Sequence, residues 1–218
     1  MTNKLKTFLP VITIGTIVVL GYVTVAKLNK DSTPPIPVVS PAINPNIEVF
    51  RKYTYTDSEG QQINLASLEG KVWVADLMFT SCPAQCAMMT AKMRSLQNGF
   101  ADVKNLRFVS LTVDPDTDTP EVLKRYAEKY KADTKQWLFL TAPQDQTIEL
   151  ARSLFQIAAD KDPDLHSNRF VLVDATGKVQ GSFNSDETLF LDKMKAAITR
   201  QLALASAKNA LGVDKKVN

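Results

Sequence analysis

The chain has 218 residues, of which 44% are hydrophobic and 22% charged, a composition that suits one globular domain with appendages. Its formal charge of +3 is uneven, because residues 1–30 hold four lysines and no acid, whereas the other 188 residues hold 22 basic and 23 acidic side chains. Phosphate recognition requires a clustered basic face, so a nearly neutral domain excludes nucleic acid as a partner.

The N-terminal segment is predicted to be a membrane anchor. Residues 8–26 form an uncharged run of 19 residues, close to the roughly 20 that a helix needs to cross a bilayer. A cleaved secretory signal is the alternative, but its apolar region is normally about 7–15 residues long, and Thr24-Val25-Ala26 is a mediocre cleavage site. Lys4 and Lys6 favour a cytoplasmic N-terminus. We therefore expect a single-pass transmembrane helix in the bacterial inner membrane, with the domain on the periplasmic side.

The chain divides into four parts on this interpretation. Residues 1–28 form the anchor with its short leader, and residues 29–46 contain five prolines, which is typical of a stiff, extended spacer. Residues 47–207 form the folded domain, and residues 208–218 are a tail. The only cysteines are Cys82 and Cys86, so no cysteine follows the apolar run closely enough for a lipoprotein anchor.

Strand and helix patterns alternate from residue 47 onward. In chain order we expect strands over 50–57 and 62–65 joined by a hairpin at 58–60, a buried strand over 71–79, a helix over 84–98, a strand over 106–113, a helix from the capping box at 118–121 to about 130, a strand over 137–140, a helix over 145–155, strands over 169–174 and 178–183 joined by a second hairpin, and a helix from 186 to about 207. This order predicts an α/β fold with a thioredoxin-like central sheet and helices on both faces.

The two cysteines lie where the buried strand gives way to a helix. This places Cys82 and Cys86 at the carboxyl edge of the sheet, where α/β folds bind ligands. Unpaired backbone N–H groups and the helix dipole at a helix N-terminus favour thiolates. The position therefore favours either binding of a soft metal or exchange of electrons.

The spacing of the two cysteines helps to discriminate between these chemistries. Side chains four positions apart on a helix have Cβ atoms about 5–6 Å apart, whereas a disulfide requires about 3.5–4.5 Å. Regular helix is therefore slightly too open for easy oxidation, although a flexible turn at Pro83 could close the gap. A structural zinc site needs about four ligands, more than two cysteines and the only histidine supply. A structural disulfide in an exported domain remains an alternative.

Other candidate ligands are a histidine, three aspartates and three methionines. His166 lies in a polar loop before a strand; a lone loop histidine is usually solvated, but a thioredoxin-like topology brings this loop near the cysteines. Two thiolates and one imidazole are a soft set suited to copper. Asp118 is interpreted as a helix cap, with Asp114 and Asp116 in the preceding turn. Methionines at helical spacing are mostly core packing, so auxiliary copper ligation is the lesser expectation for Met88, Met89 and Met93.

Three sequence motifs together resemble the Sco/SenC family over residues 47–203. They are Phe79-Thr80-Ser81-Cys82-Pro83-Ala84-Gln85-Cys86, then Thr112-Val113-Asp114-Pro115-Asp116-Thr117-Asp118-Thr119-Pro120, then His166-Ser167 ahead of Phe170-Val171-Leu172-Val173-Asp174. The resemblance implies a membrane-tethered protein with a thioredoxin-like fold. It also implies that copper is bound by Cys82, Cys86 and His166, with Asp114 and Asp118 in support. The chain departs from the family at Ala87, where a proline is common, and at Leu165, where an aspartate is common.

The resemblance further implies a copper-binding accessory protein, a metallochaperone, that assists assembly of the copper-A centre of cytochrome c oxidase. Its expected partner is the copper-A-bearing subunit, and other copper chaperones or thiol reductants are further candidates. We expect delivery of copper(I) or copper(II) rather than catalytic turnover. The alternative is a thiol–disulfide oxidoreductase in which Cys82 and Cys86 reduce the copper-accepting cysteines of that subunit.

Overall fold

The computed structural model describes residues 47–82 and 84–210. In chain order its elements are η1 (Ile47–Lys52), β1 (Thr54–Asp57), β2 (Gln62–Asn64), η2 (Leu65–Leu68), β3 (Val72–Met78), α2 (Gln85–Gly99), β4 (Leu106–Thr112), α3 (Pro120–Lys129), β5 (Trp137–Thr141), α4 (Gln144–Leu150), η3 (Ala151–Phe155), η4 (Pro163–Leu165), β6 (Arg169–Val173), β7 (Val179–Asn184) and α5 (Phe190–Ala210). Of the η elements, η3 is a π-helical turn that continues α4, and the others are 3-10 helices.

The strands form one mixed sheet of seven, in the order β2-β1-β5-β4-β3-β6-β7. The central strands β3, β4 and β5 are parallel, and the register places Val72 opposite Leu106. On one side β6 pairs antiparallel with β3, and β7 pairs antiparallel with β6. On the other side β1 pairs antiparallel with β5, and β2 pairs antiparallel with β1. The carboxyl ends of β3, β4 and β5 therefore share one edge, as expected for the predicted thioredoxin-like fold.

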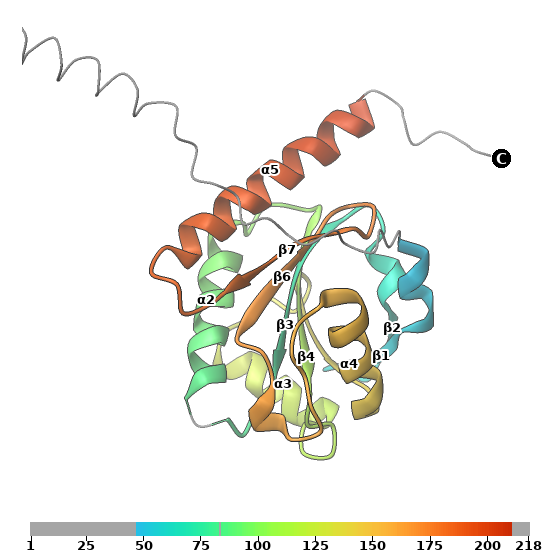
Figure 1. Ribbon diagram of the computed structural model, residues 1–218, viewed down its shortest axis with the longest axis vertical. Helices are drawn as coiled ribbons and strands as arrows, with labels where there is room; N and C mark the ends of the chain where they lie inside the picture. The colour runs from blue at the N-terminus through green and yellow to red at the C-terminus, as the bar shows by residue number, and fades with distance from the viewer. Residues whose placement is uncertain (1–46, 83, 211–218) are drawn as a thin grey trace, which may run out of the picture. The chain divides into compact units, whose positions relative to one another are not determined.

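Helices cover both faces of this sheet. The crossovers from β3 to β4 and from β4 to β5 advance in one direction, so right-handed connections place α2 and α3 on the same face. In Figure 1, α2 and α5 lie on one side of the sheet, with α4 and η1 on the other. Trp73 packs edge-on against Phe50 of η1 and Phe155 of η3 on that second side. All seven residues of β3 are buried, because both of its faces are covered.

Two predicted boundaries were wrong. The strand predicted over 50–57 begins only at Thr54, because residues 47–52 form a 3-10 helix in which Ile47 and Phe50, three positions apart, are both buried in the core. The last helix begins at Phe190 rather than at residue 186. The helix begins later in the chain because the side-chain oxygen of Asn184 accepts a hydrogen bond from the N–H of Asp186, which keeps this segment in a turn.

Both predicted hairpins are present. The turn between β1 and β2 contains Gly60 at φ +79°, and the turn between β6 and β7 contains Gly177 at φ +83°. Such a backbone conformation is easily adopted only by glycine, which is why these two turns carry it.

The predicted membrane anchor, residues 1–28, and the whole of the proline-rich spacer, residues 29–46, lie outside the described residues. Among the helices between residues 47 and 210, none is both long and apolar enough to cross a membrane. The anchor therefore stays a prediction from the sequence.

Candidate metal centre

The two cysteines occupy different environments at the carboxyl edge of the sheet. Cys82 lies half-buried in the turn after β3, whereas Cys86 is buried in the first turn of α2. The backbone N–H of Cys86 donates a hydrogen bond to the Sγ atom of Cys82, 3.3 Å away. Both thiols are free, and Pro83 lies outside the described residues.

These environments shift the pKa values of the two thiols in opposite directions. Burial acts to raise the pKa of the Cys82 thiol, but hydrogen bonds from the backbone N–H groups of Cys86, Ala84 and Gln85 outweigh burial, and the pKa lies below its ordinary value. Burial raises the pKa of the Cys86 thiol well above its ordinary value, and the neighbouring Cys82 sulfur adds to this rise. The pair therefore combines an accessible, more acidic thiol with a buried thiol that holds its proton.

The imidazole of His166 contacts the buried Cys86 thiol, although the two residues are 80 positions apart in the sequence. Its Nε2 atom lies 3.3 Å from the Sγ atom of Cys86, and its Nδ1 atom lies 3.0 Å from the carbonyl oxygen of Ser167. A carbonyl only accepts hydrogen bonds, so this contact assigns the ring hydrogen to Nδ1 and leaves the Nε2 lone pair directed at sulfur. Burial lowers the pKa of His166, although the Ser167 carbonyl and Asp164 oppose this shift.

Phe79 supports the imidazole. Its ring meets the His166 ring edge-on, with centroids 5.5 Å apart and an interplanar angle of 88°. Such edge-to-face contacts fix the orientation of the two rings. Phe79 directly follows β3, so the same turn that carries Cys82 also helps to orient His166.

Between residues 47–82 and 84–210, no cluster of three or more His, Cys, Asp or Glu side chains could hold a metal ion as it stands. The structure brings Cys86 and His166 into contact, and it ties the Cys82 sulfur to the backbone of Cys86. One nitrogen and one sulfur are therefore in contact, and the second sulfur lies on the adjacent turn.

The interpretation of Asp118 as a helix cap was wrong. The cap of α3 is Thr119, whose hydroxyl accepts the N–H of Val122. The Asp118 carboxylate is buried and accepts hydrogen bonds from the N–H and the hydroxyl of Thr80 and from the hydroxyl of Thr112. Burial raises its pKa, against the effect of the Thr112 and Thr80 hydrogen bonds. Asp118 thus connects the loop after β4 to the loop that carries Cys82.

The other secondary candidates divide by burial. Met89 and Met93 are buried in the core beneath α2, as the core interpretation predicts, whereas the Met88 side chain is 55% exposed. Asp114 is half-buried and Asp116 is exposed in the loop after β4.

Sequence reasoning missed Asp76, which is buried in the middle of β3. Its Oδ1 atom accepts a hydrogen bond of 2.7 Å from the hydroxyl of Ser110, which in turn accepts one from the indole N–H of Trp137. Its Oδ2 atom has no hydrogen-bond partner within the part of the chain that the structure describes. Burial raises the pKa of Asp76 to about 7, and the Ser110 hydrogen bond acts in the opposite direction. The available signal was a lone acid inside an otherwise apolar strand.

Comparison with known proteins agrees with this fold. The profile of the SCO1/SenC family matches residues 42–203. The SCO1 protein homolog of Bacillus subtilis is 36% identical over 148 residues, which cover 65% of this chain and 76% of that protein. A protein of Stutzerimonas stutzeri that is named "Putative copper-binding protein" is 30% identical over 133 residues, covering 57% of this chain and 64% of the other.

Solved structures show the same architecture. A SCO1/SenC family lipoprotein from Bacillus anthracis is 34% identical, with a TM-score of 0.64, and the match covers 69% of this chain and 92% of that structure. BsSco, which is described as having a disulfide switch and as a member of the Sco family of cytochrome c oxidase assembly proteins, is 32% identical, with a TM-score of 0.65, and the match covers 76% of this chain and 98% of that structure.

The fold and the site together define a thioredoxin-like protein with a dithiol and an imidazole at the carboxyl edge of its sheet. The chain belongs to the SCO1/SenC family, because the family profile matches most of its length.

Proposed function

We propose that this chain is a membrane-anchored copper-binding accessory protein that assists assembly of the copper-A centre of cytochrome c oxidase. Its copper ligands are Cys82, Cys86 and His166. The observation that carries the proposal is the 3.3 Å approach of the His166 Nε2 lone pair to the Cys86 sulfur, across eighty positions of sequence. A histidine that was merely solvated in a surface loop would not be expected to contact a buried thiol.

The ligand chemistry supports copper as the cargo. Thiolates are soft ligands that select copper(I), and imidazole also suits copper. The arrival of copper displaces the proton of the buried Cys86 thiol, and the Cys82 sulfur exchanges its hydrogen bond from the Cys86 N–H for the ion. The named Stutzerimonas stutzeri relative supports the same metal.

Release of copper follows from the difference in exposure between the ligands. Cys82 is the accessible sulfur, whereas Cys86 is buried behind it. A thiolate of the partner approaches on the Cys82 side and replaces the ligands of this chain one by one. This exchange changes no oxidation state, so it needs no electron donor.

The partner and the location rest on the family and on the N-terminal sequence. The description of BsSco as an oxidase assembly protein supports the copper-A subunit as the acceptor. The Bacillus anthracis relative is a lipoprotein, and the uncharged run over residues 8–26 offers this chain a transmembrane helix for the same purpose. The domain then works on the periplasmic side of the bacterial inner membrane.

A second candidate function is reduction of the acceptor's disulfide, and the opposite pKa shifts of the two cysteines favour it. The Cys82 thiolate attacks one sulfur of the partner's disulfide, and the other sulfur leaves as a thiolate and takes up a proton. Cys86 then gives up its proton and attacks the Cys82 sulfur, which releases the second partner thiolate. Two electrons pass to the partner, and this chain ends as a Cys82–Cys86 disulfide. The disulfide switch described for BsSco agrees with such chemistry.

One set of anaerobic experiments separates the two functions. The reduced 218-residue chain and its Cys82→Ser, Cys86→Ser and His166→Ala variants are titrated with copper(I) and copper(II). Copper-loaded protein is then mixed with a reduced, copper-free copper-A domain, and reduced, copper-free protein is mixed with the same domain in its oxidised, disulfide form. Delivery predicts one copper per chain, weaker binding by every variant, and transfer to the domain. Reduction predicts that the oxidised domain gains thiols at a rate independent of His166. Unchanged copper affinity and spectra in His166→Ala would refute the proposed ligand set.

A further inference from the structure

The segment that carries His166 is a loop between η3 and β6, closed at its base by one hydrogen bond. The N–H of Ser167 donates to the carbonyl oxygen of Ala158 at 2.9 Å. Ala159, the first residue beyond this base, is buried in the core, but the 3-10 turn η4 further out has no buried residue, and Leu165 is 60% exposed. The hydrophobic core therefore does not hold the outer part of the loop in place.

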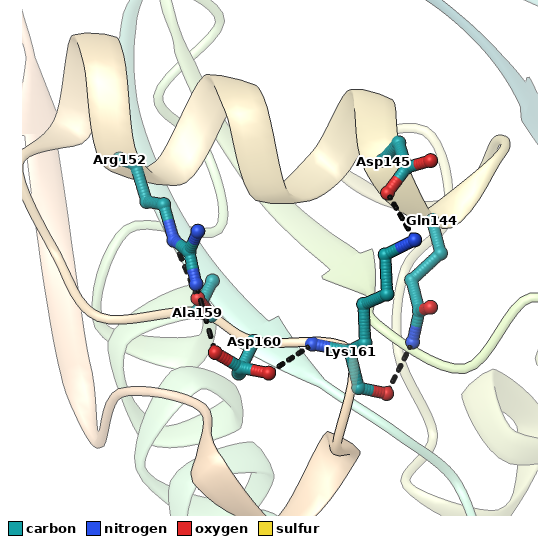
Figure 2. Close-up of polar contacts among 6 residues, drawn as sticks. All are labelled: Gln144, Asp145, Arg152, Ala159, Asp160 and Lys161. Carbon is teal, nitrogen blue, oxygen red and sulfur yellow. Dashed lines mark hydrogen bonds and ion pairs between the residues drawn. The ribbon is translucent and has the colours of Figure 1, made fainter.

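Two side chains from the preceding elements α4 and η3 hold the first half of this loop (Figure 2). The amide of Gln144 donates a hydrogen bond to the carbonyl oxygen of Lys161 at 2.9 Å. The guanidinium of Arg152 donates to the carbonyl oxygen of Ala159 at 2.8 Å and to the carboxylate of Asp160 at 2.9 Å. We call Gln144 of α4 and Arg152 of η3 the clasp. The ion pairs Arg152–Asp160 and Asp145–Lys161 add little, because their side chains are exposed, so the hydrogen bonds to the two carbonyl oxygens carry the attachment.

Gln144 also connects this loop to the cysteine side of the site. The second hydrogen of its amide is donated to the carbonyl oxygen of Val113 at 2.7 Å. Val113 follows β4 and begins the loop in which Asp118 binds Thr80, two positions before Cys82. One amide thus fixes the His166 loop relative to the strand end that supports the thiols. Only a side chain with two donors can bridge two carbonyl oxygens in this way.

The backbone around Arg152 is unusual for a helix that serves only to cover a sheet. The helix widens to a π-helical turn over Ala151–Phe155, and Gln156 then takes the left-handed conformation at φ 54°. Single π turns are frequent at functional sites, and a left-handed non-glycine residue costs conformational energy that the fold must offset. The irregular turn places Arg152 where it binds the start of the His166 loop.

From these contacts we infer that Gln144 and Arg152 are positioning residues that hold the His166 imidazole against Cys86 and so set the affinity of the site for copper(II). This inference rests on the proposed ligand set. Copper(I) is satisfied largely by two thiolates, whereas copper(II) depends more on a nitrogen ligand. Loosening the loop therefore weakens copper(II) binding selectively. Residues that orient a metal ligand from outside typically contribute about 10–100-fold to metal affinity.

The test compares clasp variants with matched controls in the 218-residue chain. Gln144→Ala, Gln144→Glu and Arg152→Ala are titrated with copper(I) and with copper(II), and the thiolate-to-copper(II) absorption band is recorded. Gln146→Ala is the control for Gln144, since both are half-buried glutamines of α4 and Gln146 donates to the carbonyl oxygen of Thr54, away from the site. Arg51→Ala is the control for Arg152, because both arginines are exposed and ion-paired.

We expect each clasp variant to lose about tenfold in copper(II) affinity and to shift the absorption band toward that of His166→Ala. Copper(I) affinity and both controls should change by less than about threefold. Gln144→Glu keeps the size of the side chain but presents oxygens to two carbonyl oxygens, so it should match Gln144→Ala. If Gln144→Ala folds poorly, Gln144→Glu still allows the effect of losing the two hydrogen bonds to be measured.

The outcomes distinguish a failure of the role inferred for the clasp from a failure of the proposed copper ligand set. If His166→Ala alters copper(II) binding but the clasp variants behave like their controls, the inference is overturned and the proposed function stands. A loss of copper(I) and copper(II) affinity in equal measure also overturns it, because the clasp would then support the fold rather than the ligand. If His166→Ala changes nothing, the proposed ligand set itself fails.

Discussion

The carboxylate of Asp118 binds Thr80, which lies 38 positions earlier in the sequence, by accepting hydrogen bonds from the backbone N–H and the hydroxyl of Thr80. A third hydrogen bond comes from the hydroxyl of Thr112 at the end of β4. The buried carboxylate therefore ties two neighbouring strand ends together directly beneath the turn that carries Cys82.

We predict that Asp118→Asn lowers the free energy of unfolding by about 1–3 kcal/mol, because the new amide cannot accept the N–H of Thr80 on both of its atoms and leaves a buried group poorly paired. Urea unfolding of the reduced, metal-free chain measures the change. Asp116→Asn is the control, since Asp116 is exposed in the same loop and its change should stay within about 0.5 kcal/mol. Equal effects of the two substitutions would contradict the role given to Asp118.

Asp76 predicts a specific pH dependence of stability. Its pKa in the folded chain is about 7, against an ordinary value of 3.8, so the folded chain retains a proton that the unfolded chain releases. The contribution of this group is therefore fully present below about pH 4 and is lost as the pH rises through about 7. Asp76→Asn removes this titrating group. The free energy of unfolding of the variant, relative to wild type, should therefore rise between pH 4 and pH 8 by at most about 4 kcal/mol, since each unit of pKa shift corresponds to about 1.4 kcal/mol. Parallel stability curves for the two proteins over this range would refute the assignment.

The two cysteines should differ in reactivity. Because the pKa of Cys82 is lowered and that of Cys86 is raised, Cys82 should react with iodoacetamide at least about tenfold faster at pH 7. Mass spectrometry of the Cys86→Ser and Cys82→Ser variants follows each thiol alone. In the unfolded chain the two rates should converge, which separates the effect of the fold from the intrinsic chemistry. Similar rates in the folded variants would show that the thiols do not divide into attacking and buried roles.

The methionines of α2 should separate into core and surface. Met93→Ala should cost about 2–5 kcal/mol of unfolding free energy, because the side chain is fully buried and its removal leaves a cavity. Met88→Ala should change stability by less than about 0.5 kcal/mol and leave copper affinity intact, since that side chain is 55% exposed. Urea unfolding and copper titration measure both. A loss of copper affinity in Met88→Ala would restore the methionine as an auxiliary ligand.

The fold could be predicted largely because local patterns were strong. The apolar run of β3, the helical spacing in α2 and the two glycine turns are all local signals, and each gave the observed element. The segment around Phe50 was misread because its aromatic, β-prone composition resembles a strand, whereas its burial spacing of three suits a 3-10 turn.

Contacts within the site were harder to predict, because they join residues that are far apart in the chain. Asp118 sits in a sequence that fits a helix cap, and only the topology shows that Thr80 is its partner. In the sequence Gln144 is an ordinary polar residue at the start of a helix. Its two partners are backbone carbonyl groups of distant loops, and any residue type has such a carbonyl, so the sequence does not indicate the contacts. The proximity of His166 to the cysteines was expected from fold class alone.

X-ray absorption at the copper edge tests the central claim most directly. Recorded on the copper-loaded 218-residue chain, it should show two sulfur ligands and one imidazole nitrogen per copper. The imidazole signal should vanish in His166→Ala, and one sulfur should be lost in each of Cys82→Ser and Cys86→Ser. A wild-type spectrum without imidazole scattering, or one unchanged by His166→Ala, would contradict the account.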